Sequence, residues 1–130
     1  MIYSIMRLMI TEEVYYLNQN EIVAGLALEL RRGTLVLLTL SQLKKPMYGY
    51  NLVKNLESAN IPIEANTLYP LMRRLESQGL LTSEWDTDGS KPRKYYVLTP
   101  DGKEVLSKVE KIWIDLTNNV NSVLEVKNNE

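Results

Sequence analysis

Two groups of polar side chains in the middle of the chain have the types and the spacing that recognise a nucleic-acid duplex. From Asn66 onward, apolar residues recur at helical spacing, so the polar residues between them share the opposite face of one helix. A second group, of Lys and Arg, follows an Asp-Gly turn. Asn can pair with adenine and Arg with guanine through two hydrogen bonds each, and basic side chains neutralise phosphates. The pattern therefore predicts a helix that enters the major groove beside a cationic hairpin.

We expect the DNA-contacting residues to lie on this helix face, at the start of the preceding helix and near the hairpin tip. These candidates are Tyr48, Asn66, Thr67, Tyr69, Arg73, Arg74, Lys91, Arg93 and Lys94. The alternative is a solvated helix face beside a turn that charge keeps soluble. Tyr48 and Tyr69 could instead be residues at the edge of the core.

The elements that must position these side chains read as a helix-turn-helix followed by a hairpin. We expect Asn66 to be the N-cap of the second helix of this motif and Gly79 to be its C-terminal cap. Trp85 should belong to the core of the hairpin. The expected elements are a helix from about Ile22 to Leu43, a helix from Tyr48 to about Ser58, a helix from Asn66 to Gly79, and strands at 80–85 and 91–98.

A long helix should end the chain. Thr99-Pro100-Asp101 is a strong helix start, because Thr favours the N-cap, Pro the first helical position and Asp the first turn. The apolar stripe that follows spans about 25 residues, more than a small domain can cover, so it predicts a homodimer. Trp113 lies on this stripe and could simply be interface core. The expected dimerisation residues are Leu106, Val109, Ile112, Leu116, Val120, Val123 and Leu124.

The composition excludes several classes of protein. The chain has neither Cys nor His, so zinc sites and Ser-His or Cys-His nucleophiles cannot be built. Asp86 and Asp88 are the only close carboxylate pair near the hairpin, and Asp is expected in a turn for backbone reasons. We therefore expect no enzyme, no cofactor and no metal. No apolar run reaches the roughly 18 residues of a transmembrane helix, so we expect no membrane partner and a cytoplasmic location.

The distribution of charge matters more than its total. The net charge is −1, but residues 31–98 hold ten Lys and Arg against six Asp and Glu, and both flanking segments are acidic. A basic central segment favours double-stranded DNA as the partner. Ordinary surface scatter is the alternative reading.

Several short motifs occur in order between about residues 30 and 102. They are Leu30-Arg31-Arg32-Gly33, Tyr48-Gly49-Tyr50, Thr67-Leu68-Tyr69-Pro70-Leu71, Arg74-Leu75-Glu76, Gln78-Gly79-Leu80, and Lys94-Tyr95-Tyr96 with Leu98-Thr99 and Gly102. Through this set of motifs the chain resembles the PadR family of bacterial transcriptional regulators. Such a resemblance implies a mainly α protein with a small β-hairpin, that is, a winged helix-turn-helix plus a long C-terminal dimerisation helix. It also implies that Trp113 stands where some members stack planar aromatic ligands.

We therefore expect a sequence-specific regulator, most simply a repressor, that binds a pseudo-palindromic operator as a homodimer and is released by a small aromatic effector. A winged-helix protein-interaction module without DNA binding is the alternative. The expected organisation is an N-terminal helical or variable extension at 1–26, a winged helix-turn-helix domain at 27–98 and a C-terminal dimerisation helix at 99–127.

Overall fold

The computed structural model describes residues 19–125. Its contacts divide the chain into two units, residues 1–34 and residues 35–130. The expected helix within residues 1–10 lies outside the described residues. In the part of the chain that the structure describes, no helix is long and apolar enough to cross a membrane.

The first unit contributes one described helix, α2, from Gln19 to Arg32. The prediction of a single helix from Ile22 to Leu43 was wrong, because the chain turns between α2 and the next helix. The N–H and the hydroxyl of Thr34 both donate to the carbonyl of Arg31, at 2.9 and 2.6 Å. Two basic residues followed by Gly33 are a helix C-terminal signal, but the apolar period that continues beyond them hid it.

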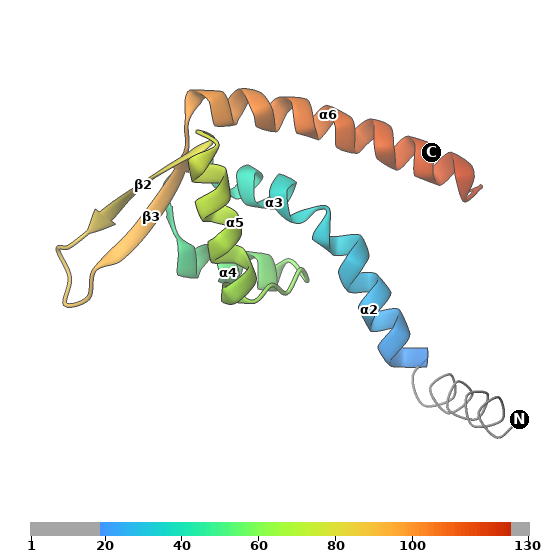
Figure 1. Ribbon diagram of the computed structural model, residues 1–130, viewed down its shortest axis with the longest axis horizontal. Helices are drawn as coiled ribbons and strands as arrows, with labels where there is room; N and C mark the ends of the chain where they lie inside the picture. The colour runs from blue at the N-terminus through green and yellow to red at the C-terminus, as the bar shows by residue number, and fades with distance from the viewer. Residues whose placement is uncertain (1–18, 126–130) are drawn as a thin grey trace, which may run out of the picture. The chain divides into compact units, whose positions relative to one another are not determined.

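The second unit is mainly helical with a small antiparallel sheet (Figure 1), as the sequence predicted. Its core is formed mostly by leucines from α3, α4, α5 and the sheet, and the first part of α6 adds Leu106. The elements are α3 (Leu35–Gln42), β1 (Met47–Tyr48), α4 (Gly49–Ser58), α5 (Ala65–Ser77), β2 (Leu81–Asp86), β3 (Arg93–Leu98) and α6 (Pro100–Val123).

The sheet has three strands in the order β1-β3-β2. The hairpin of β2 and β3 with its turn, residues 81–98, is the wing, and it extends away from α4 and α5 in Figure 1. Sequence reasoning missed β1, because it placed Tyr48 at the opening of a helix. In the structure Tyr48 pairs with Tyr95 of β3, and α4 begins one residue later.

Of the two capping residues predicted for α5, the structure confirms only the one at the C-terminal end. The prediction that Asn66 is the N-cap was wrong. Glu64 is the N-cap, and its side chain makes no capping hydrogen bond. The carbonyl of Glu64 accepts the first helical bonds instead, at 2.9 and 3.0 Å. The C-terminal cap at Gly79 is confirmed. Gly79 has φ +79°, and the N–H of Leu80 donates to the carbonyl of Leu75 at 3.0 Å, which is a Schellman closure that favours glycine.

The start of α6 is fixed to the end of α5 as well as to the wing. The hydroxyl of Thr99 accepts from the N–H of Gly102 at 3.0 Å and donates to the carbonyl of Gly79 at 2.6 Å, so the predicted N-cap is confirmed. A Cβ on Gly102 would lie 2.1 Å from the carbonyl oxygen of Leu80. Only glycine permits this close approach of helix and loop.

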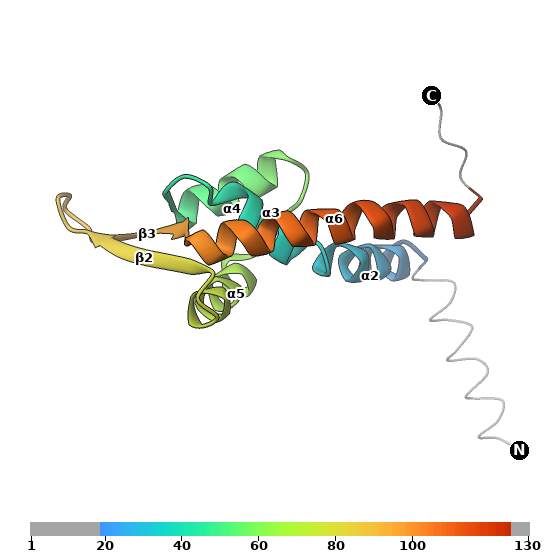
Figure 2. The same ribbon diagram turned by 90° about the horizontal axis from the view of Figure 1, so that it is seen from above.

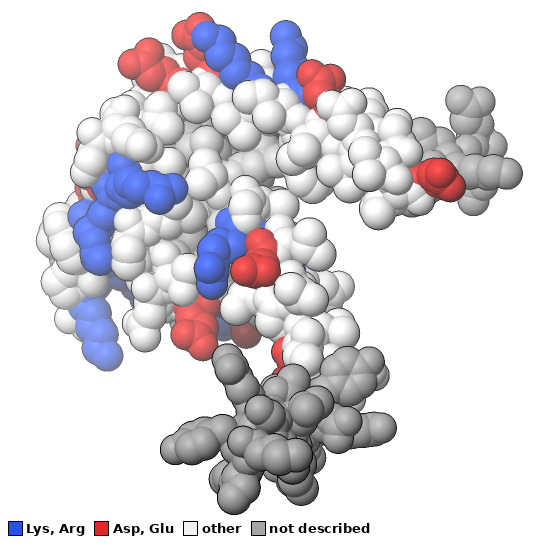
Figure 3. All heavy atoms as spheres, turned by 45° about the vertical axis from the view of Figure 1, so that its right-hand side comes forward, with Lys and Arg blue, Asp and Glu red and all other residues white. Residues whose placement is uncertain are grey.

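Beyond its first turns, α6 leaves the core of its unit, as Figure 2 shows by its extension past α3, α4 and α5. The charged residues of this helix lie between Asp101 and Asp115. In Figure 3 basic and acidic groups alternate on one end of α6, while the surface of its other half is almost uncharged. The second half of α6 therefore presents apolar and amide side chains.

Candidate nucleic-acid interface

Helix α5 separates a buried face from an exposed polar face. Leu68, Met72 and Leu75 are fully or almost fully buried, and they hold the helix on the core. On the other side Asn66, Thr67, Arg73 and Arg74 are exposed. The helical period that predicted this division is confirmed, and it leaves these side chains with hydrogen-bonding groups directed to solvent.

Tyr69 lies between these faces. Its side chain is half-buried and packs against the core. A Cβ on Gly49 would lie 2.6 Å from the Tyr69 ring, so the glycine at the start of α4 makes room for that ring. Tyr69 therefore joins α5 to α4, as expected for a residue at the edge of the core.

Tyr48 is half-buried and is engaged within the chain. Its hydroxyl donates to Asp86 Oδ2 at 2.5 Å, which connects β1 to the far end of β2. The Tyr48 ring meets that of Tyr95 edge-on, with centroids 6.0 Å apart. The Tyr48 hydroxyl is thus occupied, and what Tyr48 offers to an outside partner is its ring.

Asp86 shapes the turn of the wing as well. Its Oδ1 accepts from the N–H of Asp88 at 3.0 Å, an Asx-type turn contact of the kind expected for Asp there. The hydrogen bond from Tyr48, and then that from Asp88, lower the pKa of Asp86, while the same bond to the carboxylate raises the pKa of Tyr48. Both shifts favour a charged Asp86 beside a neutral Tyr48.

Two of the three predicted cations of the wing lie near aromatic rings. The guanidinium of Arg93 lies 5.5 Å from the centroid of Tyr48. Lys94 Nζ lies 5.7 Å from the centroid of Trp85 and 5.6 Å from that of Tyr96. Lys91 is exposed in the turn. Neighbouring rings therefore orient Arg93 and Lys94, while Lys91 is simply exposed.

The prediction that Trp85 belongs to the core of the hairpin was wrong, because 62% of its surface is exposed. It stands opposite Lys94, two register pairs beyond the pair of Ser83 with buried Tyr96 and therefore on the same face of the hairpin. The core ends at Tyr96, so the indole continues the inner side of the wing without cover. Strand alternation could have placed it on this side, but it could not show where the core stops.

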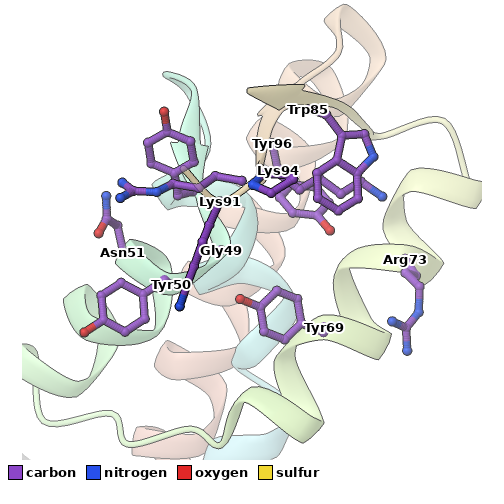
Figure 4. Close-up of a pocket in the computed structure, with 12 residues that line it drawn as sticks. Gly49, Tyr50, Asn51, Tyr69, Arg73, Trp85, Lys91, Lys94 and Tyr96 are labelled. Carbon is purple, nitrogen blue, oxygen red and sulfur yellow. The ribbon is translucent and has the colours of Figure 1, made fainter. Parts of the chain in front are cut away.

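Candidate side chains from β1, α5 and the wing, together with residues at the start of α4, surround one hollow of about 860 Å³ (Figure 4). Tyr48, Tyr69, Arg73, Lys91, Arg93 and Lys94 line it, whereas Asn66, Thr67 and Arg74 lie outside its lining. Among the residues that the structure describes, no Asp or Glu lines it. The structure therefore brings six of the nine predicted contact residues to one cationic, aromatic concavity, with the other three on the same exposed face of α5.

The expected dimerisation residues on α6 fall into two groups. Leu106 is only 3% exposed and belongs to the core of the single chain, so its assignment to an interface is corrected. Val109 is half-buried, and Trp113 is 43% exposed. The apolar residues that follow are exposed: Ile112, Leu116, Val120, Val123 and Leu124.

Known proteins share both this sequence pattern and this fold. The sequence profile of the transcriptional regulator PadR-like family matches residues 36–108. A PadR family transcriptional regulator from Eggerthella lenta DSM 2243 is 63% identical, with a TM-score of 0.79, and the match covers 83% of this chain and 96% of that chain. One from Clostridium difficile R20291 is 31% identical, with a TM-score of 0.65 and coverages of 70% and 98%. A transcriptional regulator of Mycobacterium tuberculosis is 31% identical over 74 residues, which are 57% of this chain and 69% of the relative.

Proposed function

Because the chain belongs to the PadR-like family of transcriptional regulators, we propose that it is a repressor that binds a pseudo-palindromic operator as a homodimer. Family membership makes it a DNA-binding regulator rather than an enzyme, as expected. In the proposed complex one α5 helix from each subunit enters one of two successive major grooves, and each wing contacts the flanking backbone.

One observation carries the proposal: Arg73 on the exposed face of α5 and the cations of the wing border the same hollow, which no carboxylate of residues 19–125 lines. A duplex needs a polar helix for its base edges and positive charge for its phosphates on one side of the protein. Arg73 supplies a group for a guanine edge, and Lys91 and Arg93 supply phosphate contacts. Asn66 is exposed in the first turn of α5, where recognition helices contact bases.

The apolar face of α6 supports the dimer. Ile112, Leu116 and Val120 recur every four residues on one side of the helix, and they are 62, 51 and 45% exposed. A single chain that leaves such a stripe in water forgoes the free energy of burying it. Packing on the same helix of a second copy would cover it.

The proposed effector is a small planar aromatic compound that stacks on Trp113. This side chain lies on the α6 stripe and is partly exposed in the single chain, so two subunits would present two indoles to one interface. Occupation of that interface would change the spacing of the two α5 helices and so the fraction of dimers able to bind the operator.

The test is a comparison of charge-neutralised variants on DNA from upstream of the protein's own gene. Each lost phosphate contact should lower the slope of log affinity against log salt by about 0.9, so Lys91→Gln and Arg93→Gln should each flatten it. Arg73→Gln should lose about 1–3 kcal/mol of preference for the native fragment over a scrambled one. Lys108→Gln, on the exposed side of α6, is the matched control and should change neither quantity.

An interaction module without DNA binding gives a different result. In that case neither the native chain nor the four variants bind either fragment, even at low salt. This outcome would contradict the proposal directly.

A further inference from the structure

The base of the wing lies beside the C-terminal end of α5 (Figure 1), and one side-chain hydrogen bond joins the two elements there. The hydroxyl of Ser83 in β2 donates to Oε1 of Glu76 in α5 at 2.7 Å. Both side chains are half-buried. The two residues stand on either side of the loop at 78–80, so the bond holds β2 against the helix as well as against its partner strand.

Ser83 stands at the point where the wing parts from the core. On the same face of β2, Leu81 is almost fully buried two residues earlier, and Trp85 is exposed two residues later. Ser83 pairs in register with Tyr96, and no residue of β3 nearer the turn is buried. Among residues 19–125, the bond to Glu76 is the one side-chain hydrogen bond between α5 and the wing. It therefore acts where packing alone no longer fixes the strand.

Glu76 is surrounded as a hydrogen-bond acceptor and not as a member of an ion pair. The ion pair that forms within residues 19–125 is that of Lys108 with Glu104, so no Lys or Arg there neutralises Glu76. Burial raises the pKa of Tyr96, and the negative charge of Glu76 raises it further, so this carboxylate lies close to the end of the core. Hydrogen bonds to a charged acceptor are stronger than neutral ones, and loss of the Ser83 hydroxyl would leave the half-buried carboxylate without this donor.

The bond lies between the two groups that the proposed function assigns to DNA. Arg73 is about one helical turn before Glu76 on α5, and Lys91 and Arg93 belong to the part of the wing beyond Ser83. A duplex must meet the helix and the wing together, so binding is tighter when their relative direction is fixed in advance. Neither Ser83 nor Glu76 is among the residues that line the hollow between them.

We propose that the bond between Ser83 and Glu76 fixes the direction of the wing relative to α5, and that both are positioning residues for operator preference that do not contact DNA. The part that concerns the operator rests on the proposed function. The bond from Tyr48 to Asp86 is made on the opposite face of β2. Side chains thus hold β2 to β1 on one face and to α5 on the other.

The direction of the wing is measured without DNA, from residual dipolar couplings of the backbone amides of the full chain. In the native chain the couplings of α5 and of residues 81–98 should fit one common orientation. In Ser83→Ala the couplings of residues 84–93 should shrink relative to those of α5, because the outer wing is then averaged over several directions. Ser83→Thr keeps a hydroxyl on a residue that suits a strand and should retain the native couplings. Ser107→Ala, exposed on α6, is the matched control and should also retain them.

Operator preference is measured as the ratio of the affinities for the upstream fragment and for a scrambled one. Ser83→Ala alters no charge, so its affinity for the scrambled fragment should stay native, while the ratio should fall about fivefold or more. Ser83→Thr should keep the native ratio. Glu76→Gln should keep it too, because the amide oxygen is still an acceptor. In Glu76→Ala the ratio should fall as in Ser83→Ala, and the double variant should lose no more, because both changes remove one bond.

Two outcomes distinguish a wrong positioning role from a wrong function. If the native chain prefers the upstream fragment but Ser83→Ala changes neither the couplings nor that preference, the positioning role is wrong and the function stands. If Ser83→Ala changes the couplings but the native chain prefers neither fragment, the function is wrong and the bond still sets the direction of the wing. An equal loss of affinity for both fragments in Ser83→Ala would also overturn the positioning role, because general destabilisation gives that result.

Discussion

The hydroxyl of Tyr48 donates to the carboxylate of Asp86 across the three-stranded sheet, with 2.5 Å between the oxygens. Tyr48 immediately precedes α4, and Asp86 ends β2. The wing is therefore held to the helix-turn-helix by a side-chain bond in addition to its backbone pairing. Since Asp86 Oδ1 also accepts from the N–H of Asp88, one carboxylate connects the helix-turn-helix with the turn that carries the wing cations.

The first prediction concerns the pKa of Asp86, measured from the carboxyl ¹³C shift during a pH titration. In the native chain the midpoint should lie below the ordinary value of about 3.9. In Tyr48→Phe it should rise, but not fully, because the Asp88 N–H remains a donor. An unchanged midpoint in Tyr48→Phe would mean that the bond to Tyr48 is not formed in solution.

The same bond limits the pH range in which it stabilises the fold. The pKa of Asp86 is lower in the folded chain than in the unfolded chain. The bond therefore stabilises the fold at pH values above the pKa of the unfolded chain, and this stabilisation is lost as the pH falls through the pKa of the folded chain. The pKa of Tyr48 is higher in the folded chain than its value of about 10 in the unfolded chain. This difference also stabilises the fold at pH values below about 10, and the stabilisation is lost as the pH rises through the pKa of the folded chain. The difference in unfolding free energy between the native chain and Tyr48→Phe should thus be constant near neutrality and shrink at both extremes.

The second prediction is that Gly102→Ala destabilises the chain by at least about 2 kcal/mol. The added methyl group would meet the backbone carbonyl of Leu80 at 2.1 Å, so α6 or the loop after α5 must move. Gly25→Ala is the matched control, because a Cβ there meets nothing within 4 Å and α2 is helical. Urea unfolding of both variants measures the difference, and equal stabilities would contradict the close approach of α6.

The third prediction is a gain in stability from Thr39→Val. Thr39 is fully buried in α3, and its hydroxyl has no hydrogen-bond partner in the described part of the chain. Replacement of the hydroxyl by a methyl group of similar size removes an unsatisfied polar atom and should add about 1 kcal/mol to the free energy of unfolding. The exposed Thr82→Val in β2 should change it by less than about 0.5 kcal/mol. A loss of stability in Thr39→Val would show that the hydroxyl has a partner in solution.

Much of the fold could be predicted because its signals are local. The apolar period of α5, the positive φ required at Gly79 and the capping sequence at Thr99-Pro100 each depend on a few consecutive residues. The bond of Tyr48 with Asp86 could not be predicted, since it joins residues 38 apart through a strand of only two residues. A strand that short has no alternation to detect.

The candidate site was predictable in its composition but not in its shape. The polar face of α5 and the basic wing follow from helical period and charge, which need no tertiary information. The exposure of Trp85 depends on where the core ends, and the burial of Leu106 depends on how α6 packs on α3. A periodic stripe does not distinguish residues that pack within the chain from those left for a partner.

The fourth prediction therefore uses the part of the stripe that the chain leaves exposed. Leu116→Lys should raise the dissociation constant of the dimer about 100-fold or more, because a charge would have to be buried in the apolar interface. Asn118→Lys is the matched control, since residue 118 lies about 200° further around the helix. Sedimentation equilibrium of both variants measures the dissociation constant of the dimer. A Leu116→Lys chain that still associates as the native one does would exclude this face as the dimer interface.

The most direct measurement of the central claim is binding of the native protein to the DNA upstream of its own gene, compared with a scrambled fragment of the same composition. The fragments should be titrated at several salt concentrations between about 50 and 200 mM. We predict that the native fragment is preferred, that its affinity falls linearly in log salt, and that protection appears over two half-sites about one helical turn apart. Equal affinity for the two fragments, or no binding at the lowest salt concentration, would contradict a sequence-specific regulator.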